Sequence, residues 1–244
     1  MRVIVCNDYD EMSIKAAKLV ASQITLKPNC VMGLATGSTP IGLYDRLVEM
    51  EKMGEVDFSD VTTFNLDEYY PISPKNDQSY RYFMNKHLFS KVNIDIKRTH
   101  VPNGETDDPD AECERYEKLI NAAGGIDLQI LGIGQNGHIG FNEPDINLNT
   151  VTHLTDLTES TIDANSRFFA SSDEVPTKAI TMGMASILKS RKIILLASGR
   201  TKAAVVAELL KDSINTSVPA TLLNVHPDVV LICDREAYAD TARE

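Results

Sequence analysis

One glycine-rich stretch near the middle of the chain combines side chains that can exchange protons. Residues 132–144 read Gly-Ile-Gly-Gln-Asn-Gly-His-Ile-Gly-Phe-Asn-Glu-Pro and follow a short apolar run, 126–131, typical of a buried parallel strand. A histidine titrates near neutral pH and a nearby carboxylate can raise its basicity, so His138 with Glu143 could move a proton on or off a substrate hydroxyl. A hydrogen bond within the loop is the structural alternative for His138. Metal binding is disfavoured because no second His or Cys lies at ligand spacing.

The same stretch matches a nucleotide-binding pattern that its context argues against. Gly132-x-Gly134-x-x-Gly137 fits the dinucleotide fingerprint. That fingerprint needs a helix to begin at the third glycine and receive the pyrophosphate, whereas Gly140 and Pro144 oppose a helix here. The motif also normally lies in the first strand–helix unit of a chain. We therefore interpret the stretch as an active-site loop at the carboxyl end of a strand.

A carboxylate directly after another predicted strand is the second candidate for proton transfer. Asp67 follows the apolar run 61–66, and a side chain at the carboxyl end of such a strand points into the shared cleft. Partial removal from water would raise the pKa of Asp67 toward the range in which a carboxylate takes a proton from carbon. Asp67 and Glu68 are adjacent, so on a regular backbone only one of them can face the site. The alternative interpretation of Asp67 is a turn-forming or helix-capping acid.

Two predicted strand-to-helix corners contain small residues that favour anion binding. Residues 36–40 read Thr-Gly-Ser-Thr-Pro, and residues 198–202 read Ser-Gly-Arg-Thr-Lys. Backbone N–H groups and hydroxyls at such corners can cradle a phosphate, although Ser and Thr also cap helices without binding a ligand. Lys202 could add a point charge or be an ordinary surface lysine, and Arg167 could be a further phosphate ligand or an interface arginine. The predicted phosphate ligands are Thr36, Gly37, Ser38, Thr39, Arg167 and Lys202.

Strand and helix patterns alternate along nearly the whole chain. Strands are expected at 1–6, 31–35, 61–66, 126–133, 192–197 and 229–233, with a short extended piece near 100–102. Helices are expected over 12–24, from 40 to about 53, and over 80–89, 108–122, 158–168, 177–189 and 202–211, with Pro109 suited to a first turn. This alternation predicts a parallel sheet covered by helices. Without a repeat or a linker-like segment, residues 1–244 are expected to form a single domain.

Composition narrows the classes of partner. The net charge of −11 disfavours nucleic acid and acidic membranes, which attract basic patches. No apolar run is long enough to span a bilayer, and the N-terminus reads as a strand and not as a signal peptide. The scattered cysteines (Cys6, Cys30, Cys113 and Cys233) are expected to be reduced and buried, which together predicts a cytoplasmic protein.

Four segments, taken in order, resemble the glucosamine-6-phosphate deaminases. They are Gly-Leu-Ala-Thr-Gly-Ser-Thr-Pro (33–40), Phe-Asn-Leu-Asp-Glu-Tyr (64–69), the loop 132–144 and Ala-Asn-Ser-Arg-Phe-Phe (164–169). The resemblance implies a modified Rossmann-like α/β fold, with an open, mostly parallel sheet and helices on both faces. It also implies conversion of α-D-glucosamine 6-phosphate and water to β-D-fructose 6-phosphate and ammonia in amino-sugar catabolism, without a metal or organic cofactor.

The resemblance further implies roles for the candidate residues. His138 resembles the family's ring-opening acid/base, assisted by Glu143 and Asn136. Asp67 resembles the base that removes the C2 proton to give an enolamine and then returns a proton to C1, after which the ketimine loses ammonia on hydrolysis. Such proton transfers need no electrophilic cofactor, because the amine and the opened aldehyde of the substrate supply the activation. The phosphate would be held by Gly37, Ser38, Thr39, Arg167 and Lys202.

Two departures from the longer, hexameric bacterial members are visible. Those members have an aspartate where this chain has Asn136, which cannot titrate and is expected to position His138 by hydrogen bonding. They are also activated by N-acetylglucosamine 6-phosphate at a Ser/Arg/Lys site, whose matching positions here are Ile146, His153 and Thr155. The C-terminal extension of those members is missing as well. We therefore expect no such activation, and a monomer or small homo-oligomer.

Two rival functions remain open. A 6-phosphogluconolactonase would share the fold and a glycine–histidine loop but hydrolyse an ester, and it would need no carbon-acid base at Asp67. A sugar-phosphate-sensing regulator would keep the pocket without catalysis. The intact set of Asp67, His138 and Glu143 favours the deaminase over both.

Overall fold

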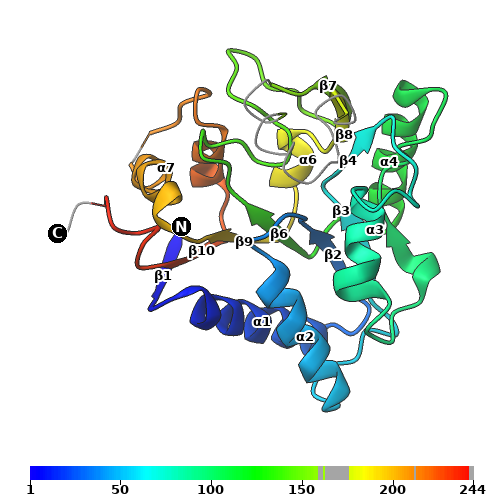
Figure 1. The fold of residues 1–244 in the computed structure, drawn as a ribbon, viewed down its shortest axis with the longest axis horizontal. Coiled ribbons are helices and arrows are strands. Elements are labelled where there is room, and N and C mark those ends of the chain that lie inside the picture. The colour runs from blue at the N-terminus through cyan, green and yellow to red at the C-terminus, as the bar shows by residue number, and fades with distance from the viewer. Residues whose placement is uncertain (159–161, 163–175, 212, 242–244) are drawn as a thin grey trace.

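The computed structural model describes residues 1–158, 162, 176–211 and 213–241 (Figure 1). Its main sheet has seven strands, all parallel, in the order β1-β10-β9-β6-β2-β3-β5. The strands are β1 (Arg2–Cys6), β2 (Val31–Leu34), β3 (Thr62–Asn65), β5 (Thr99–His100), β6 (Leu128–Gly132), β9 (Lys192–Ala197) and β10 (Val229–Asp234). The predicted α/β fold with a mostly parallel sheet is therefore confirmed.

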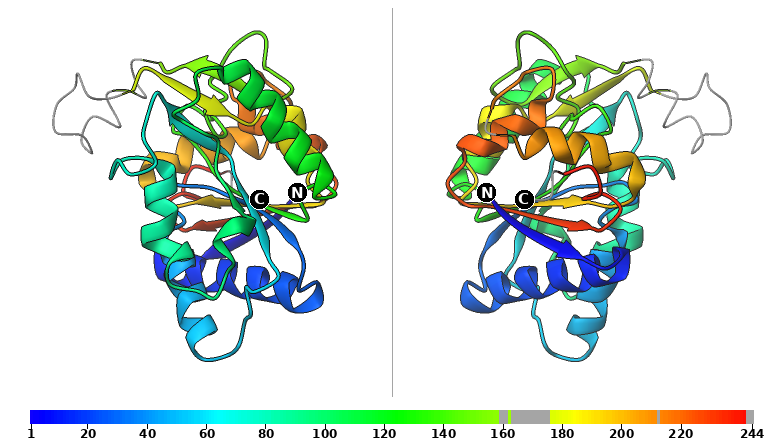
Figure 2. Two further views of the ribbon diagram at one scale, coloured as in Figure 1. Left: turned by 90° about the vertical axis from the view of Figure 1, so that its right-hand side faces the viewer. Right: turned by 90° about the vertical axis from the view of Figure 1, so that its left-hand side faces the viewer.

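Helices cover both faces of this sheet. α1 (Tyr9–Leu26) and α2 (Ile41–Lys52) lie on one face, and α4 (Pro109–Ala122), α6 (Met184–Leu188) and α7 (Ala203–Leu209) lie on the other (Figures 1 and 2). Further helical segments are α3 (Tyr80–Met84), the π-helix η1 (Asn85–Phe89) and the 3-10 helices η2 (Ile96–Arg98), η4 (Arg200–Lys202) and η5 (Pro219–Val225).

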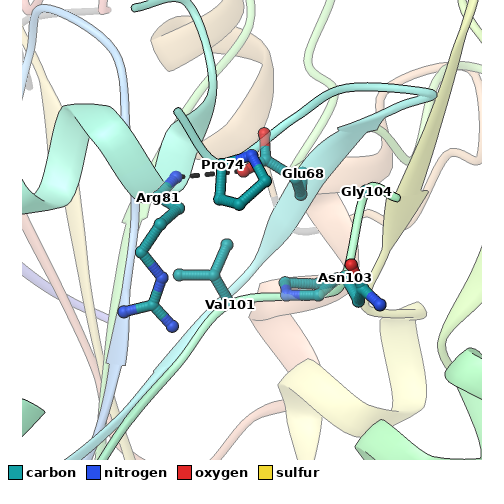
Figure 3. A pocket seen from close by; sticks show the side chains of 7 residues that line it. Glu68, Pro74, Arg81, Val101, Asn103 and Gly104 are labelled. Carbon is teal, nitrogen blue, oxygen red and sulfur yellow. Dashed lines mark hydrogen bonds between the residues drawn. The ribbon is translucent and has the colours of Figure 1, made fainter. Parts of the chain in front are cut away.

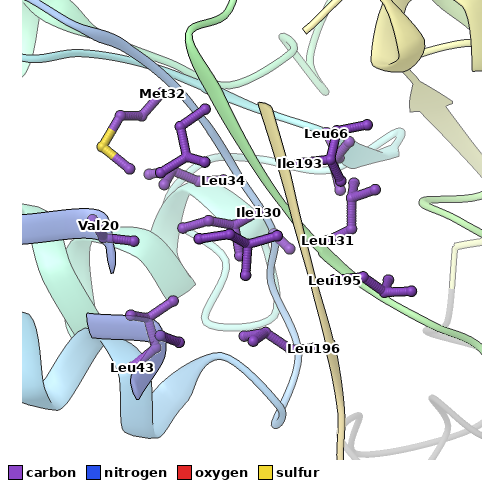
Figure 4. Close-up of a cluster of buried hydrophobic side chains, with 14 of the residues drawn as sticks. Val20, Met32, Leu34, Leu43, Leu66, Ile130, Leu131, Ile193, Leu195 and Leu196 are labelled. Atoms are coloured by element: carbon purple, nitrogen blue, oxygen red, sulfur yellow. The ribbon is translucent and has the colours of Figure 1, made fainter. Parts of the chain in front are cut away.

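The local sequence explains why α4, β9 and β10 form where they do. The Asp108 carboxylate caps α4 by accepting a hydrogen bond from the N–H of Ala111, and Pro109 occupies the first turn, where its missing N–H costs nothing. β9 and β10 are buried along nearly their whole length because helices cover both sides of the sheet. Figure 4 shows side chains of the central strands packing against apolar residues of α1 and α2, including Val20 and Leu43.

The order of the strands places a topological switch point between β2 and β6. From β2 the chain builds outward through β3 and β5, and from β6 it builds in the opposite direction through β9 and β10. Ligands of open α/β sheets bind at the carboxyl ends of the strands beside such a point. Gly33 is paired with Gln129 across this seam, and a Cβ on Gly33 would lie 2.0 Å from the Gln129 Oε1 atom, so a larger residue here would displace the buried Gln129 side chain.

A second, antiparallel sheet of three strands was not predicted from the sequence. It consists of β4 (Asp67–Tyr70), β8 (Lys178–Thr181) and β7 (His153–Asp156), with β8 in the middle. The expected helix over 177–189 is therefore wrong in its first half, and only the short α6 follows β8. Lys178–Thr181 becomes a strand because β4 and β7 supply hydrogen-bond partners on both sides. The helix expected over 158–168 lies mostly outside the described residues.

Candidate active site

The loop after β6 brings its three predicted polar side chains together. The Glu143 Oε2 atom accepts a hydrogen bond from the Asn136 Nδ2 atom at 2.7 Å and lies 3.4 Å from the His138 Nδ1 atom. The Asn136 Oδ1 atom accepts a hydrogen bond from the backbone N–H of His138 at 3.2 Å. Asn136 therefore bridges the carboxylate and the histidine backbone, which fixes the approach of Glu143 to the imidazole.

Glycines create the space that this arrangement needs. A Cβ on Gly134 would lie 2.3 Å from the His138 Nδ1 atom, so any larger residue would displace the ring. Gly137 has a φ of 89°, a left-handed conformation that other residues rarely adopt. The glycine spacing thus serves the turn that presents His138, and no helix begins in this loop.

Asp67 lies beside the same loop, at the start of β4. A Cβ on Gly140 would lie 3.3 Å from the Asp67 Oδ2 atom and 3.0 Å from the Thr181 Oγ1 atom. Thr181 is paired with Asp67 across β4 and β8, so the two side chains share one face of the small sheet. The Thr181 hydroxyl also accepts a hydrogen bond from the backbone N–H of Phe141 at 3.1 Å. Strand pairing and loop contact therefore place Asp67 against the 132–144 loop.

The environment of Asp67 favours its protonated form. The side chain is only 5% exposed, and burial, together with the neighbouring charge of Glu68, raises the pKa of Asp67 to about 8. Among the described residues, none donates a hydrogen bond to this carboxylate. A buried carboxylate whose oxygens keep no protein donor is suited to take a proton from a substrate.

Glu68 has a different set of contacts on the opposite face of β4. Its carboxylate accepts hydrogen bonds from the backbone N–H groups of Tyr69 at 3.0 Å, Tyr80 at 2.7 Å and Arg81 at 3.0 Å. Burial nevertheless raises the pKa of Glu68 to about 7. The helix-capping role that the sequence left open for Asp67 thus belongs to its neighbour, which holds the first turn of α3.

A cavity of about 190 Å³ lies on the Glu68 side of β4 (Figure 3). The Arg81 guanidinium turns away from Glu68 in this view and donates hydrogen bonds to the Thr99 hydroxyl at 2.7 Å and the Thr99 carbonyl at 2.9 Å. The other side chains that line the cavity are short and partly apolar, and include Val101 and Asn103. None of the predicted catalytic residues lines it.

The corner after β2 has the properties expected of an anion cradle. Gly37 has a φ of 90° and open space where a side chain would be, and Ser38 is exposed. Within the described part of the chain, the backbone N–H groups of Gly37, Ser38 and Thr39 have no recorded protein acceptor. The corner lies at the carboxyl end of β2, next to the switch point, and Thr36 begins it.

The corner after β9 was also expected to be an anion cradle, but its first two residues already bind a carboxylate of the protein. The Asp234 carboxylate accepts hydrogen bonds from the Ser198 hydroxyl at 2.5 Å and from the Gly199 N–H at 2.9 Å. The cradle groups of this second corner are therefore occupied by a carboxylate of the chain itself, and its first two residues are not free to bind an anion.

Lys202, at the end of that corner, still faces the site. Its Nζ atom donates a hydrogen bond to the carbonyl of Ile133 at 2.6 Å, at the base of the 132–144 loop. Burial lowers the pKa of Lys202, and none of the carboxylates in the described ranges lies within ion-pair distance of it. The predicted ligand Arg167 lies outside the described residues.

Sequence reasoning missed two residues that shape the site. Thr181 was assigned to a helix, and only its β-branched, apolar surroundings pointed to a strand. Asn142 was seen as one polar residue of the loop, but its Nδ2 atom donates hydrogen bonds to the carbonyls of Ile139 and Met182, both at 2.8 Å. Asn142 thus ties the loop to the end of β8.

The structurally described part of the chain contains no group of three or more His, Cys, Asp or Glu side chains placed to hold a metal ion. Among the same residues, no helix is both long and apolar enough to cross a membrane.

The chain is similar to known proteins over nearly its whole length. A model of the family "Glucosamine-6-phosphate isomerases/6-phosphogluconolactonase" matches residues 7–231. The chain belongs to this family. It is 62% identical over 237 residues to a glucosamine-6-phosphate deaminase of Halothermothrix orenii, covering 97% of this chain and 98% of that protein. It is 56% identical over 237 residues to one of Clostridioides difficile, covering 97% and 95% of the two chains.

Solved structures agree with this family membership. A monomeric glucosamine-6-phosphate deaminase superposes with a TM-score of 0.96 at 45% identity, covering 98% of this chain and 100% of that chain. A 6-phosphogluconolactonase from Thermotoga maritima superposes with a TM-score of 0.75 at 23% identity, covering 96% and 99%. The second likeness is one of fold alone, so sequence identity within the family separates this chain from the lactonase structure.

Proposed function

We propose that this family member converts α-D-glucosamine 6-phosphate and water to β-D-fructose 6-phosphate and ammonia. The observation that carries the proposal is the buried carboxylate of Asp67, which accepts no hydrogen bond from the described residues and lies beside the glycine loop that presents His138. A sugar isomerisation needs a base that removes a proton from carbon, whereas lactone hydrolysis needs none. High identity to proteins named glucosamine-6-phosphate deaminases supports the same choice.

In this proposal the loop after β6 opens the sugar ring. His138 transfers a proton between the ring oxygen and the C1 hydroxyl, and Glu143, 3.4 Å from its Nδ1 atom, stabilises the charged imidazole. Asn136 holds Glu143 through a hydrogen bond of 2.7 Å and carries no charge of its own. An uncharged residue here is compatible with catalysis because the carboxylate of Glu143 remains to balance the imidazolium.

Asp67 then acts on the open-chain form. Its carboxylate removes the C2 proton to give an enolamine and returns that proton to C1, which moves the carbonyl oxidation level from C1 to C2. Water adds to the resulting ketimine, and ammonia leaves. The raised pKa of Asp67 fits both steps, since a carboxylate with a pKa of about 8 is a stronger base than an exposed one and holds the proton until C1 accepts it.

The phosphate of the substrate would bind the corner after β2. The N–H groups of Gly37, Ser38 and Thr39 are available there, and the positive end of α2 adds a favourable field. Lys202 follows β9, which is separated from β2 by β6, and its Nζ atom reaches the end of β6 at the Ile133 carbonyl. Arg167 is proposed as a further ligand. Binding the phosphate away from the reacting carbons would orient C2 toward Asp67 at no cost to the chemistry.

The direct test is to incubate the purified chain with glucosamine 6-phosphate and to measure ammonia and fructose 6-phosphate in equal amounts. In parallel, 6-phosphogluconolactone hydrolysis is measured against its spontaneous rate. Release of both products without lactonase activity supports the proposal, and lactone hydrolysis without ammonia contradicts it. Addition of N-acetylglucosamine 6-phosphate should leave the rate unchanged, and light scattering should give the mass of a monomer, as in the monomeric deaminase of similar structure.

A further inference from the structure

Two tyrosine hydroxyls donate hydrogen bonds to backbone carbonyls of the corner after β2. The Tyr44 hydroxyl donates a hydrogen bond to the carbonyl of Ala35 at 2.6 Å. The Tyr9 hydroxyl donates one to the carbonyl of Ser38 at 3.1 Å. The two carbonyls flank Gly37, so each end of the turn is tied to a helix that packs against the same face of the sheet.

These contacts determine where the amide hydrogens of the corner point. A trans peptide is planar, with its C=O and N–H on opposite sides, so a hydrogen bond that fixes the Ser38 carbonyl also fixes the direction of the Thr39 N–H. A carbonyl oxygen repels a phosphate and an amide hydrogen attracts it. A corner that binds an anion must therefore keep its carbonyls turned inward. For the peptide between Ser38 and Thr39 the Tyr9 hydroxyl makes the shorter contact, at 3.1 Å, and the Ile41 N–H adds a longer hydrogen bond of 3.4 Å to the same carbonyl.

The Tyr9 hydroxyl is itself held in one orientation. It accepts a hydrogen bond from the Gly42 N–H at 2.8 Å, which leaves its own proton for the Ser38 carbonyl. Helices α1 and α2 approach closely at this point, since a Cβ on Gly42 would lie 2.9 Å from the Tyr9 Cε1 atom and 2.4 Å from the Ser13 Oγ atom. Tyr9 is thus a fixed bridge between the first turn of α2 and the corner before it.

We propose that Tyr9 is a positioning residue of the phosphate site, which it preorganises by holding the Ser38 carbonyl away from the ligand. This inference rests on the proposed function, because it assigns the corner to the substrate's phosphate. Tyr9 touches no reacting atom, so it affects binding of the phosphate group and not the proton transfers at Asp67 and His138.

The test variant is Tyr9→Phe, which keeps the ring and removes only the hydroxyl. Losing one such hydrogen bond is expected to raise KM for glucosamine 6-phosphate about fivefold, while kcat stays within about twofold of wild type. The matched control is Tyr70→Phe, which also removes a tyrosine-to-carbonyl hydrogen bond of 3.1 Å, from Tyr70 to Thr106, outside the corner. The control should leave KM unchanged.

A second measurement uses inorganic phosphate as the probe. Calorimetric titration with phosphate should give a dissociation constant about fivefold higher for Tyr9→Phe than for wild type and Tyr70→Phe. An unchanged phosphate affinity, or a fall in kcat with KM unchanged, would overturn the proposal. Thermal unfolding of both variants checks that they are folded at the assay temperature. If wild type releases no ammonia, the proposed function fails while the titration still decides whether Tyr9 shapes an anion site.

Discussion

Asp67 and Glu68 are neighbours in the chain and both are buried carboxylic acids, yet their surroundings differ. Glu68 is 2% exposed and accepts three backbone hydrogen bonds, whereas Asp67 is 5% exposed and accepts none from the described residues. Consecutive residues of a strand point to opposite faces, so one carboxylate turns to α3 and the other to the glycine loop. The same chemical group therefore serves stability on one face of β4 and, in our proposal, catalysis on the other.

The largest expected difference between the two acids is in activity. Replacing Asp67 by Asn should lower kcat by about a thousandfold or more, because the amide cannot take the C2 proton. Ammonia release measured with a coupled assay checks this, and Asp60→Asn, at an exposed carboxylate paired with Arg98, is the control that should keep full activity. Retention of more than about a tenth of the wild-type rate would remove Asp67 from the mechanism.

The pH dependence of the reaction should follow the ionisation of Asp67, and the charge of Glu68 should shift it. Only ionised Asp67 is a base, so kcat/KM should rise with pH up to about 8, changing about fiftyfold between pH 6 and pH 8. The charge of Glu68 contributes to the raised pKa, so Glu68→Gln should move this limb to lower pH. Because both enzymes use the same substrate, the shift isolates the enzyme group. Superimposable profiles would show that the two acids are not coupled.

Replacing Glu68 should lower the stability of the protein, because its carboxylate accepts backbone hydrogen bonds that hold α3. Glu68→Gln places an amide NH2 group against N–H donors of Tyr80 or Arg81, which should lower the free energy of unfolding by about 2–3 kcal/mol. Urea denaturation measures the change. Glu114→Gln, at a 74% exposed side chain that pairs with Lys118, should change it by less than about 0.5 kcal/mol. Equal effects of the two substitutions would mean that Glu68 does not hold α3.

The last expected difference is a gain in stability on removing the acid of Asp67. Its pKa is raised in the folded protein, so the folded state holds a proton that the unfolded chain releases near pH 4, and stability falls as pH rises from about 4 to about 8. Asp67→Asn removes this cost, although the buried amide keeps a desolvation cost of its own, and should be more stable than wild type at pH 8. The difference should vanish near pH 4. A variant less stable than wild type at pH 8 would argue against a desolvated carboxylate.

The two strand-to-helix corners show how far the sequence could predict the site. Both have the small residues of an anion cradle, and both follow parallel strands of one sheet, as predicted. Asp234, at the end of β10, occupies the second corner, and its position beside Ser198 depends on the pairing of β9 with β10. That pairing joins residues 36 positions apart, so no local pattern at 198–202 could reveal the occupied corner.

For the fold as well, elements with local signals were predicted correctly, and elements that depend on distant strands were not. The buried strands of the large sheet and the α4 helix were predicted because their signals are local: β-branched apolar runs, and a proline at 109 that suits the first turn of a helix. The segment 177–189 was assigned wrongly because its residues suit a helix or a strand, and the edges of β4 and β7 decide between them. Thr181 was missed for the same reason.

The sequence by itself determined the family, the parallel sheet and the chemical groups available, since these depend on residue types and on periodicities of a few residues. The tertiary structure alone decided which of two adjacent acids lies beside the glycine loop and which of two similar corners keeps free amides. Strand order and pairing bring distant segments together, and burial then changes the pKa values and hydrogen-bond partners of groups that are equivalent in the sequence.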